Sequence, residues 1–167
     1  MPIVSTHPVF EALRNSADAC VCTVLRKASR ASTQMYDGIL EPSGLTIAQF
    51  SLLAALYYTR SIPMKKLARR LVMERTTLTR NLAPLERRNL IELVGDRDDR
   101  RIRMVTLTAQ GLEALISALP YWQEAQDKMI AGLGESLWRE LRSSLRLSVD
   151  IALAADQARA AVQAAMY

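Results

Sequence analysis

Residues 64–108 read MKKLARRLVMERTTLTRNLAPLERRNLIELVGDRDDRRIRMVTLT, and this stretch decides the fold. Its apolar residues recur at spacings of three and four, which predicts a short helix over Met64–Leu71 and a second over Arg75–Asn89, separated by Val72–Glu74. Pro84 lies inside the second helix, so we expect either a kink near Leu82 or a ring tolerated on the outer side. The residues expected to face inward are Leu67, Leu71, Leu78, Leu82 and Leu85.

A β-hairpin follows these two helices. Leu90–Val94 and Arg103–Thr108 are rich in β-branched and aliphatic residues, the second with clear period-two alternation, and the residues between them are polar and charged. These are the only convincing strands, and Ser61–Pro63 is interpreted as a loop. Two helices joined by a tight turn and followed by a hairpin form a winged helix-turn-helix, in which the hairpin is the wing.

Longer helices flank this unit on both sides. A long amphipathic helix is predicted over residues 16–40, preceded by a shorter one at Pro8–Arg14. Thr46 is expected to cap a helix over Ile47–Tyr58. Thr108 is expected to cap another that runs to Leu133, with a kink at Pro120, and a terminal helix over Glu135–Ala165 carries an exposed apolar stripe. The fold class is therefore mostly α with a small β-hairpin.

The basic residues are concentrated in one quarter of the chain. Between Arg60 and Arg103 there are 13 Lys or Arg residues and 6 Asp or Glu residues, while the other 123 residues carry 9 and 11. A basic segment of net charge +7 on an otherwise slightly acidic chain is the electrostatic pattern expected of nucleic-acid binding. The alternative is a solvated charged face.

The composition argues against several other classes of protein. The 167 residues suffice for one compact domain or two small ones. His7 is the single histidine, and there is no glycine-rich phosphate loop, no metal-ligand spacing and no paired catalytic carboxylates, so we expect no enzyme, no metal and no cofactor. The start lacks the basic residues of a secretory signal, and no apolar run approaches the ~20 residues of a membrane span, which predicts a cytoplasmic protein.

The start of the second helix carries side chains suited to reading DNA. An arginine can bridge two acceptors on guanine, and a threonine offers a hydroxyl for phosphate or base and a methyl for thymine. The wing tip mixes arginines with carboxylates that could hold an arginine for insertion into a narrow minor groove. The predicted DNA contacts are Lys65, Lys66, Arg75, Thr76, Thr77, Thr79, Arg80, Arg97, Arg100, Arg101 and Arg103.

The order and spacing of these motifs resemble the MarR family of bacterial transcription regulators over nearly the whole chain. The matching segments are residues 45–53, 67–71, 75–82, 85–91, 99–101 and 105–111. Two positions depart from the family pattern. Glu74 stands where a Ser or Asp cap is frequent, which weakens the cap, and Asn89 replaces a usual glycine, a mild change because asparagine tolerates a left-handed backbone.

The resemblance implies a homodimer that binds double-stranded DNA at a palindromic operator. The helix beginning near Arg75 would enter the major groove, Arg101 of the wing would reach the minor groove, and the N- and C-terminal helices would form the dimer. The expected parts are 1–44, N-terminal helices that contribute to dimerisation; 45–110, the DNA-binding winged helix; and 111–167, the C-terminal dimerisation helices. A repressor is expected from family habit, and a winged helix used only for protein contacts is the less favoured alternative.

Two kinds of signal are open for such a regulator. One is a small aromatic or carboxylate effector, for which Arg26, Tyr36, Phe50 and Tyr57 are candidate pocket residues. The other is an oxidant: Cys22 lies one helical turn from Arg26 and falls where the peroxide-sensing members of the family carry their reactive cysteine. A small apolar role for Cys22 is the more common situation. Cys20 and Cys22 point to different helix faces, which makes a disulfide between them unfavourable.

Overall fold

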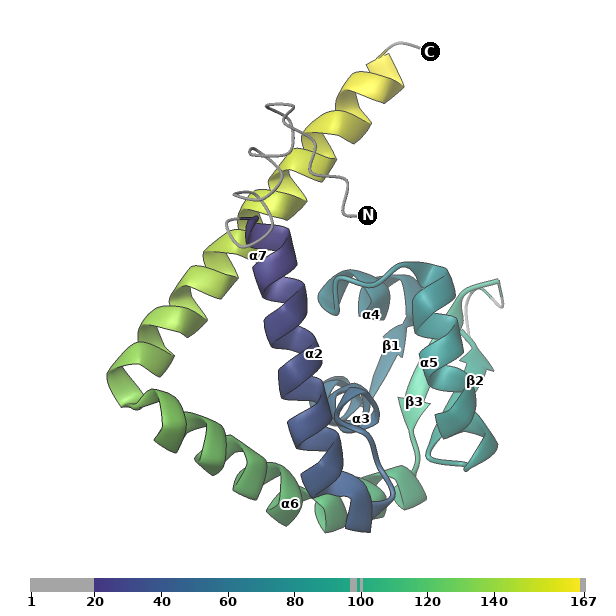
Figure 1. The fold of residues 1–167 in the computed structure, drawn as a ribbon. Coiled ribbons are helices and arrows are strands. Elements are labelled where there is room, and N and C mark those ends of the chain that lie inside the picture. Colours follow the sequence, from purple (N-terminus) through teal and green to yellow (C-terminus); the bar gives the residue numbers. More distant parts are fainter. Residues whose placement is uncertain (1–19, 97–98, 100, 166–167) are drawn as a thin grey trace, which may run out of the picture. The chain divides into compact units, whose positions relative to one another are not determined.

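The computed structural model describes residues 20–96, 99 and 101–165. Two compact units divide near Ala125, the second beginning at Gln126. The described residues are mostly helical, as predicted, and the predicted helix at Pro8–Arg14 lies outside them. The elements shown in Figure 1 are α2 (Val21–Leu40), the 3-10 turn η1 (Glu41–Ser43), α3 (Ile47–Thr59), β1 (Ser61–Pro63), α4 (Met64–Arg70), α5 (Arg75–Arg87), β2 (Ile91–Gly95), β3 (Arg103–Leu107), α6 (Ala109–Leu133) and α7 (Glu135–Ala165).

The sheet has three antiparallel strands in the order β1-β3-β2. The hairpin β2–β3 was predicted, and Leu93 pairs with Val105 in its register. Strand β1 was not predicted, because Ser61–Pro63 was interpreted as a loop. Ile62 of β1 pairs with Val105 on the edge of β3 opposite to β2. This three-residue strand therefore forms because it pairs with β3, not because its own residues have a high strand propensity.

A leucine core joins the helices to the sheet. Leu53 and Leu56 of α3, Leu67 of α4 and Leu82 of α5 are all fully buried, as is Val105 of β3. The predicted inner stripe of α5 is confirmed, and the helix continues through Pro84 with the ring half-buried. Leu71, expected to face inward, is half-buried at the end of α4. This core fixes α4, α5 and the wing around one small sheet, as Figure 1 shows.

Side-chain caps fix the starts of α3 and α6. The predicted Thr46 cap is a full capping box, in which the Gln49 amide donates to Thr46 Oγ1 and the Thr46 amide donates to Gln49 Oε1. Asp37 of α2 adds a third bond by accepting from the Ile47 amide at 2.7 Å. Thr108 accepts from the Gly111 amide at 2.9 Å, as expected of a cap, and donates to the Asn89 carbonyl.

Helices α4 and α5 end in the same backbone motif. The Met73 amide donates to the Ala68 carbonyl and the Val72 amide to the Arg69 carbonyl, the pair of bonds that defines a Schellman ending. The corresponding bonds after α5 run from Leu90 and Asn89. The left-handed residue of this motif is Asn89 in α5, with φ of 55°, as predicted, and Val72 in α4, with φ of 52°.

The long helices leave apolar side chains in water. Helix α2 matches the described part of the predicted 16–40 helix, and its Val21 and Val24 are 68% and 48% exposed. Helix α6 runs through Pro120 to Leu133, after which Gly134 has a φ of 79°. Over its described side chains, 135–164, α7 buries none.

In the part of the chain that the structure describes, no single helix is both long and apolar enough to cross a bilayer. One pair of helical segments, Val21–Ser43 and Ile47–Thr59, bent at 74° to each other, is long and apolar enough when the two are taken together, by length and composition alone.

Candidate nucleic-acid interface

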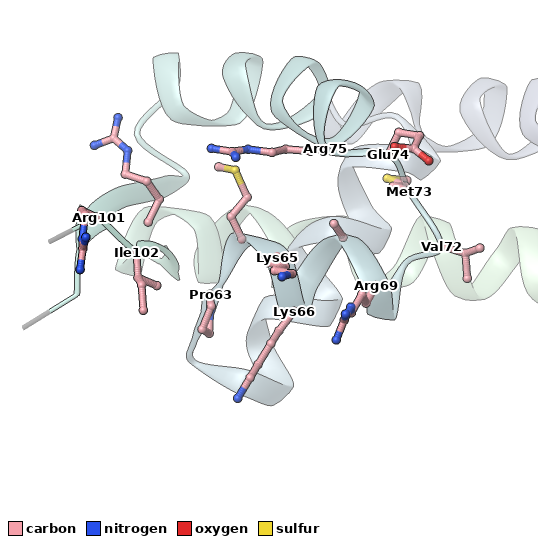
Figure 2. A pocket seen from close by; sticks show the side chains of 13 residues that line it. Pro63, Lys65, Lys66, Arg69, Val72, Met73, Glu74, Arg75, Arg101 and Ile102 are labelled. Carbon is pink, nitrogen blue, oxygen red and sulfur yellow. The ribbon is translucent and has the colours of Figure 1, made fainter. Parts of the chain in front are cut away.

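A cationic groove lies between α4, the start of α5 and the end of the wing. Its volume is about 780 Å³, and Figure 2 shows its lining. Among the described residues that line it, Glu74 is the single acid. The positively charged lining residues are Lys65, Lys66, Arg69, Arg75, Arg101 and Arg103. An open groove lined by cations attracts a polyanion, because their fields add within one Debye length, roughly 8–10 Å at physiological salt.

Helix α4 supplies three of these cations through its amphipathic pattern. Met64, Leu67 and Ala68 are buried, so the helical period leaves Lys65, Lys66 and Arg69 exposed. Lys66 and Arg69 extend to the same side of the helix in Figure 2. Arg69 was not among the DNA contacts predicted from the sequence. Its exposed position is visible in the helical pattern, whereas its place in the groove depends on where the wing lies.

Helix α5 begins at the groove without a side-chain cap. Glu74 is its N-cap residue and makes no capping bond, so the expectation of a weakened cap is confirmed. Arg75 lines the groove, with Thr76 and Arg80 exposed farther along the helix and Thr77 half-buried. The Thr79 hydroxyl donates to the Arg75 carbonyl at 2.9 Å. Arg75 is thus the residue of α5 that the structure brings together with the α4 cations.

The wing holds its arginine with a carboxylate. Arg101 Nε lies 3.0 Å from Asp99 Oδ1, and the Arg101 side chain is 92% exposed. The hydrogen bond from the Arg101 side chain, followed by that from its backbone amide, lowers the pKa of Asp99 below its usual range. The sequence predicted that carboxylates would hold the wing arginines, and this pair has that form. Arg103 also lines the groove, while Arg97 and Arg100 lie outside the described residues.

The candidate effector residues are divided between core and surface. Phe50 is buried and stacks on Trp122 with ring centroids 5.5 Å apart, and Tyr36 is buried, which raises the pKa of its phenol through desolvation. Tyr57 is 53% exposed and lies edge-on to Tyr58, and Arg26 is exposed. The structure therefore groups Tyr36 and Phe50 with buried residues, and leaves Arg26 and Tyr57 accessible.

Both thiols are exposed at the first turn of α2. Cys22 was considered in sequence as a small apolar residue or as a reactive thiol, and in the single chain it is exposed. Cys20 precedes the helix, where the Thr23 side chain and then the Thr23 and Cys22 backbone amides form hydrogen bonds that lower the pKa of its thiol. A larger thiolate fraction favours nucleophilic attack on an oxidant. The sequence drew attention to Cys22 and gave no reason to favour Cys20.

Comparison with known proteins places this geometry among transcriptional regulators. The MarR family profile matches residues 45–102. The regulator YhbI of Bacillus subtilis (strain 168) is 34% identical over 99 residues, which are 59% of this chain and 62% of that relative, so the match spans less than two thirds of its length. The organic hydroperoxide resistance regulator of the same organism is 29% identical, over 55% of this chain and 63% of that relative.

A solved structure of a transcriptional regulator resembles most of this chain. The transcriptional regulator MosR of M. tuberculosis, crystallised in complex with DNA, superposes with a TM-score of 0.74 at 38% identity. The superposition covers 81% of this chain and 97% of that one.

Proposed function

This chain belongs to the MarR family of winged helix-turn-helix transcriptional regulators, a DNA-binding class, and from that premise we propose that its cationic groove holds duplex DNA as part of a homodimeric repressor. The groove is the observation that carries the proposal, because it combines six described cations with a single carboxylate. Each cation that neutralises a phosphate releases a counterion, so binding through this groove depends steeply on salt.

In and beside the groove, two kinds of contact with DNA have different roles. Lys65, Lys66 and Arg69 on α4 contact phosphates and fix the register of the protein on the duplex. Arg80 and the exposed face of α5 read base edges in the major groove, and Arg101 enters the minor groove from the wing. Thr76, Thr77 and Thr79 contribute through hydroxyl or methyl groups, and Arg97 and Arg100 add positive charge at the wing tip.

A second copy of the chain completes the DNA-reading surface. The apolar residues that α2 and α7 expose would be buried between the N-terminal part, 1–44, and the C-terminal part, 111–167, of two copies. Two winged helices, 45–110, would then lie one helical turn of DNA apart, about 34 Å, which calls for a palindromic operator.

The specific residues can be tested on a duplex selected from a random library by the purified protein. Arg80→Ala should lower affinity for the selected duplex about tenfold or more and leave affinity for random DNA nearly unchanged. Lys66→Ala should weaken binding to both and reduce the slope of log K against log salt by about one unit. Arg70→Ala is the matched control, since Arg70 is an exposed α4 cation outside the groove lining.

The outcomes separate the DNA-reading function from its alternative. Failure of the library to yield any preferred duplex would support a winged helix used only for protein contacts. Equal losses for Lys66→Ala and Arg70→Ala would instead show that charge anywhere on α4 suffices, which contradicts a role for the groove.

A small aromatic or carboxylate molecule is our first candidate for the signal that releases DNA. Arg26 and Tyr57 are the accessible members of the candidate set, and they suit a carboxylate and an aromatic ring respectively. A thermal-shift screen of phenolic acids and acyl thioesters, followed by operator release, is the appropriate test. A hit whose effect survives both Arg26→Met and Tyr57→Ala would place the effector elsewhere.

Oxidation of Cys22 is the second candidate signal, favoured by the exposure of both thiols near the start of α2. Organic hydroperoxide should release DNA from the wild type and not from Cys22→Ser. Cys20→Ser is the matched control, and it also reveals whether the thiol with the lowered pKa is the reactive one. Identical release from the wild type and from both single variants would remove the thiol mechanism.

A further inference from the structure

We propose that Val72 is a sequence-reading residue whose side-chain methyl groups contact the C5 methyl of a thymine in the bound duplex. The proposal rests on the cationic groove being the DNA interface and adds a base-specific apolar contact to it. Three observations on Val72 support it: its backbone conformation, its exposure and its place in the groove.

The backbone at Val72 is unfavourable for valine. Its φ of 52° lies in the left-handed region, where a branched Cβ crowds the backbone and glycine is strongly preferred. The equivalent position after α5 is occupied by Asn89, with φ of 55°, and asparagine is among the residues that tolerate this conformation. The same Schellman ending is therefore built once with a suitable residue and once with an unsuitable one.

Packing does not compensate for this strain. The Val72 side chain is 56% exposed, so it fills no core position that would justify a branched residue. Local strain that packing does not explain is typical of functional sites, where the side chain serves a purpose outside the folded chain.

The location of Val72 indicates what that purpose is. It lines the groove in the turn that joins α4 to α5, and Figure 2 shows it at one end of the lining, beyond Arg69. Base edges in the major groove present donors and acceptors and one apolar group, the thymine methyl. An exposed aliphatic side chain among cations that hold phosphates is thus suited to that methyl.

The proposal predicts effects of opposite sign on stability and on binding. Val72→Gly should raise the thermal midpoint by about 2–6 °C, since glycine relieves the strained φ. The same variant should bind the library-selected duplex about three- to tenfold more weakly. Val72→Ala separates loss of the methyl groups from gain of backbone freedom, and it should also weaken binding. Asn89→Gly is the matched control in the same motif, for which we expect unchanged affinity.

Replacing each thymine of the selected duplex by uracil removes the C5 methyl alone. At one thymine in each half-site, uracil should weaken binding by the wild type and have no effect on binding by Val72→Gly. Equal uracil penalties in the two proteins, or full affinity of Val72→Gly and Val72→Ala, would overturn the role of Val72. If Lys66→Ala also retains full affinity, the groove itself is not the interface, and the proposed function fails with it.

Discussion

Leu53, Leu67 and Leu82 of the winged helix are fully buried within one chain, whereas Leu137 and Leu141 of α7 are 50% and 37% exposed. The two regions have similar apolar residues at helical spacing, so the difference lies in what covers them. The winged helix contains its own sheet and three helices that close around it. Helix α7 has no such cover among its described side chains, which is the physical reason to expect a second copy of the chain.

The largest expected loss of stability in the winged helix comes from a substitution at Gly111, where the start of α6 lies against Leu90 and Leu107. A Cβ built there overlaps the Leu90 carbonyl oxygen and approaches the Leu107 side chain at 2.8 Å, and backbone cannot yield cheaply. Gly111→Ala should therefore lower the free energy of unfolding by about 3–5 kcal/mol at every protein concentration. Urea denaturation measures this, and Gly132→Ala is the control, because its added Cβ meets nothing within 4 Å. A loss below about 1 kcal/mol would show that α6 can shift away from the sheet.

In helix α7, loss of apolar surface should weaken dimerisation. Leu137→Ala with Leu141→Ala should raise the dissociation constant of the dimer about ten- to a hundredfold, because each truncation removes apolar surface from the contact. Sedimentation equilibrium gives this constant, and Glu140→Ala on the same helix is the control. Loss of stability without any change in association would mean that α7 packs within its own chain.

The starts of α3 and α5 offer a finer contrast, because α3 has a side-chain cap and α5 has none. Thr46→Ala removes the capping box of α3 and should cost about 1 kcal/mol of stability. Glu74→Ser would give α5 the cap that it lacks and should add about 0.5–1 kcal/mol. Thermal unfolding of both variants tests the pair. A destabilised Glu74→Ser protein would indicate that the Glu74 carboxylate stabilises α5 in another way.

The smallest expected effect concerns the wing. Because the Arg101 side chain lowers the pKa of Asp99, the stabilising pair is complete above the ordinary carboxyl pKa and is lost as pH falls through the lowered one. An NMR titration should find the Asp99 midpoint below its ordinary value, and Arg101→Gln should move it upward. An unchanged midpoint in Arg101→Gln would show that the backbone alone sets it.

Helix positions could be predicted from the sequence because local patterns determine them. The inner stripe of α5, the Thr46 cap and the left-handed Asn89 each depend on residues within one or two turns. Strand β1 could not be predicted, since Ser61–Pro63 is too short to show alternation and forms by pairing with Thr106, Val105 and Met104 of β3. The left-handed backbone at Val72 could not be predicted either, because valine disfavours that conformation.

For the cationic groove, the sequence predicted the positive charge but not the full set of residues that line it. The helical pattern identified Lys65 and Lys66 as outward cations, whereas the inclusion of Arg69 in the groove depends on the distance between α4 and the wing. The burial of Phe50 depends on Trp122, far along the chain, and no local pattern predicts that stacking.

The central claim is that two copies of this chain present two cationic grooves to one duplex. Native mass spectrometry of the protein with its library-selected duplex tests it most directly. We predict a free protein of twice the chain mass of 18.7 kDa and a complex with two chains per duplex. A free monomer that binds the duplex as a single chain would contradict the claim.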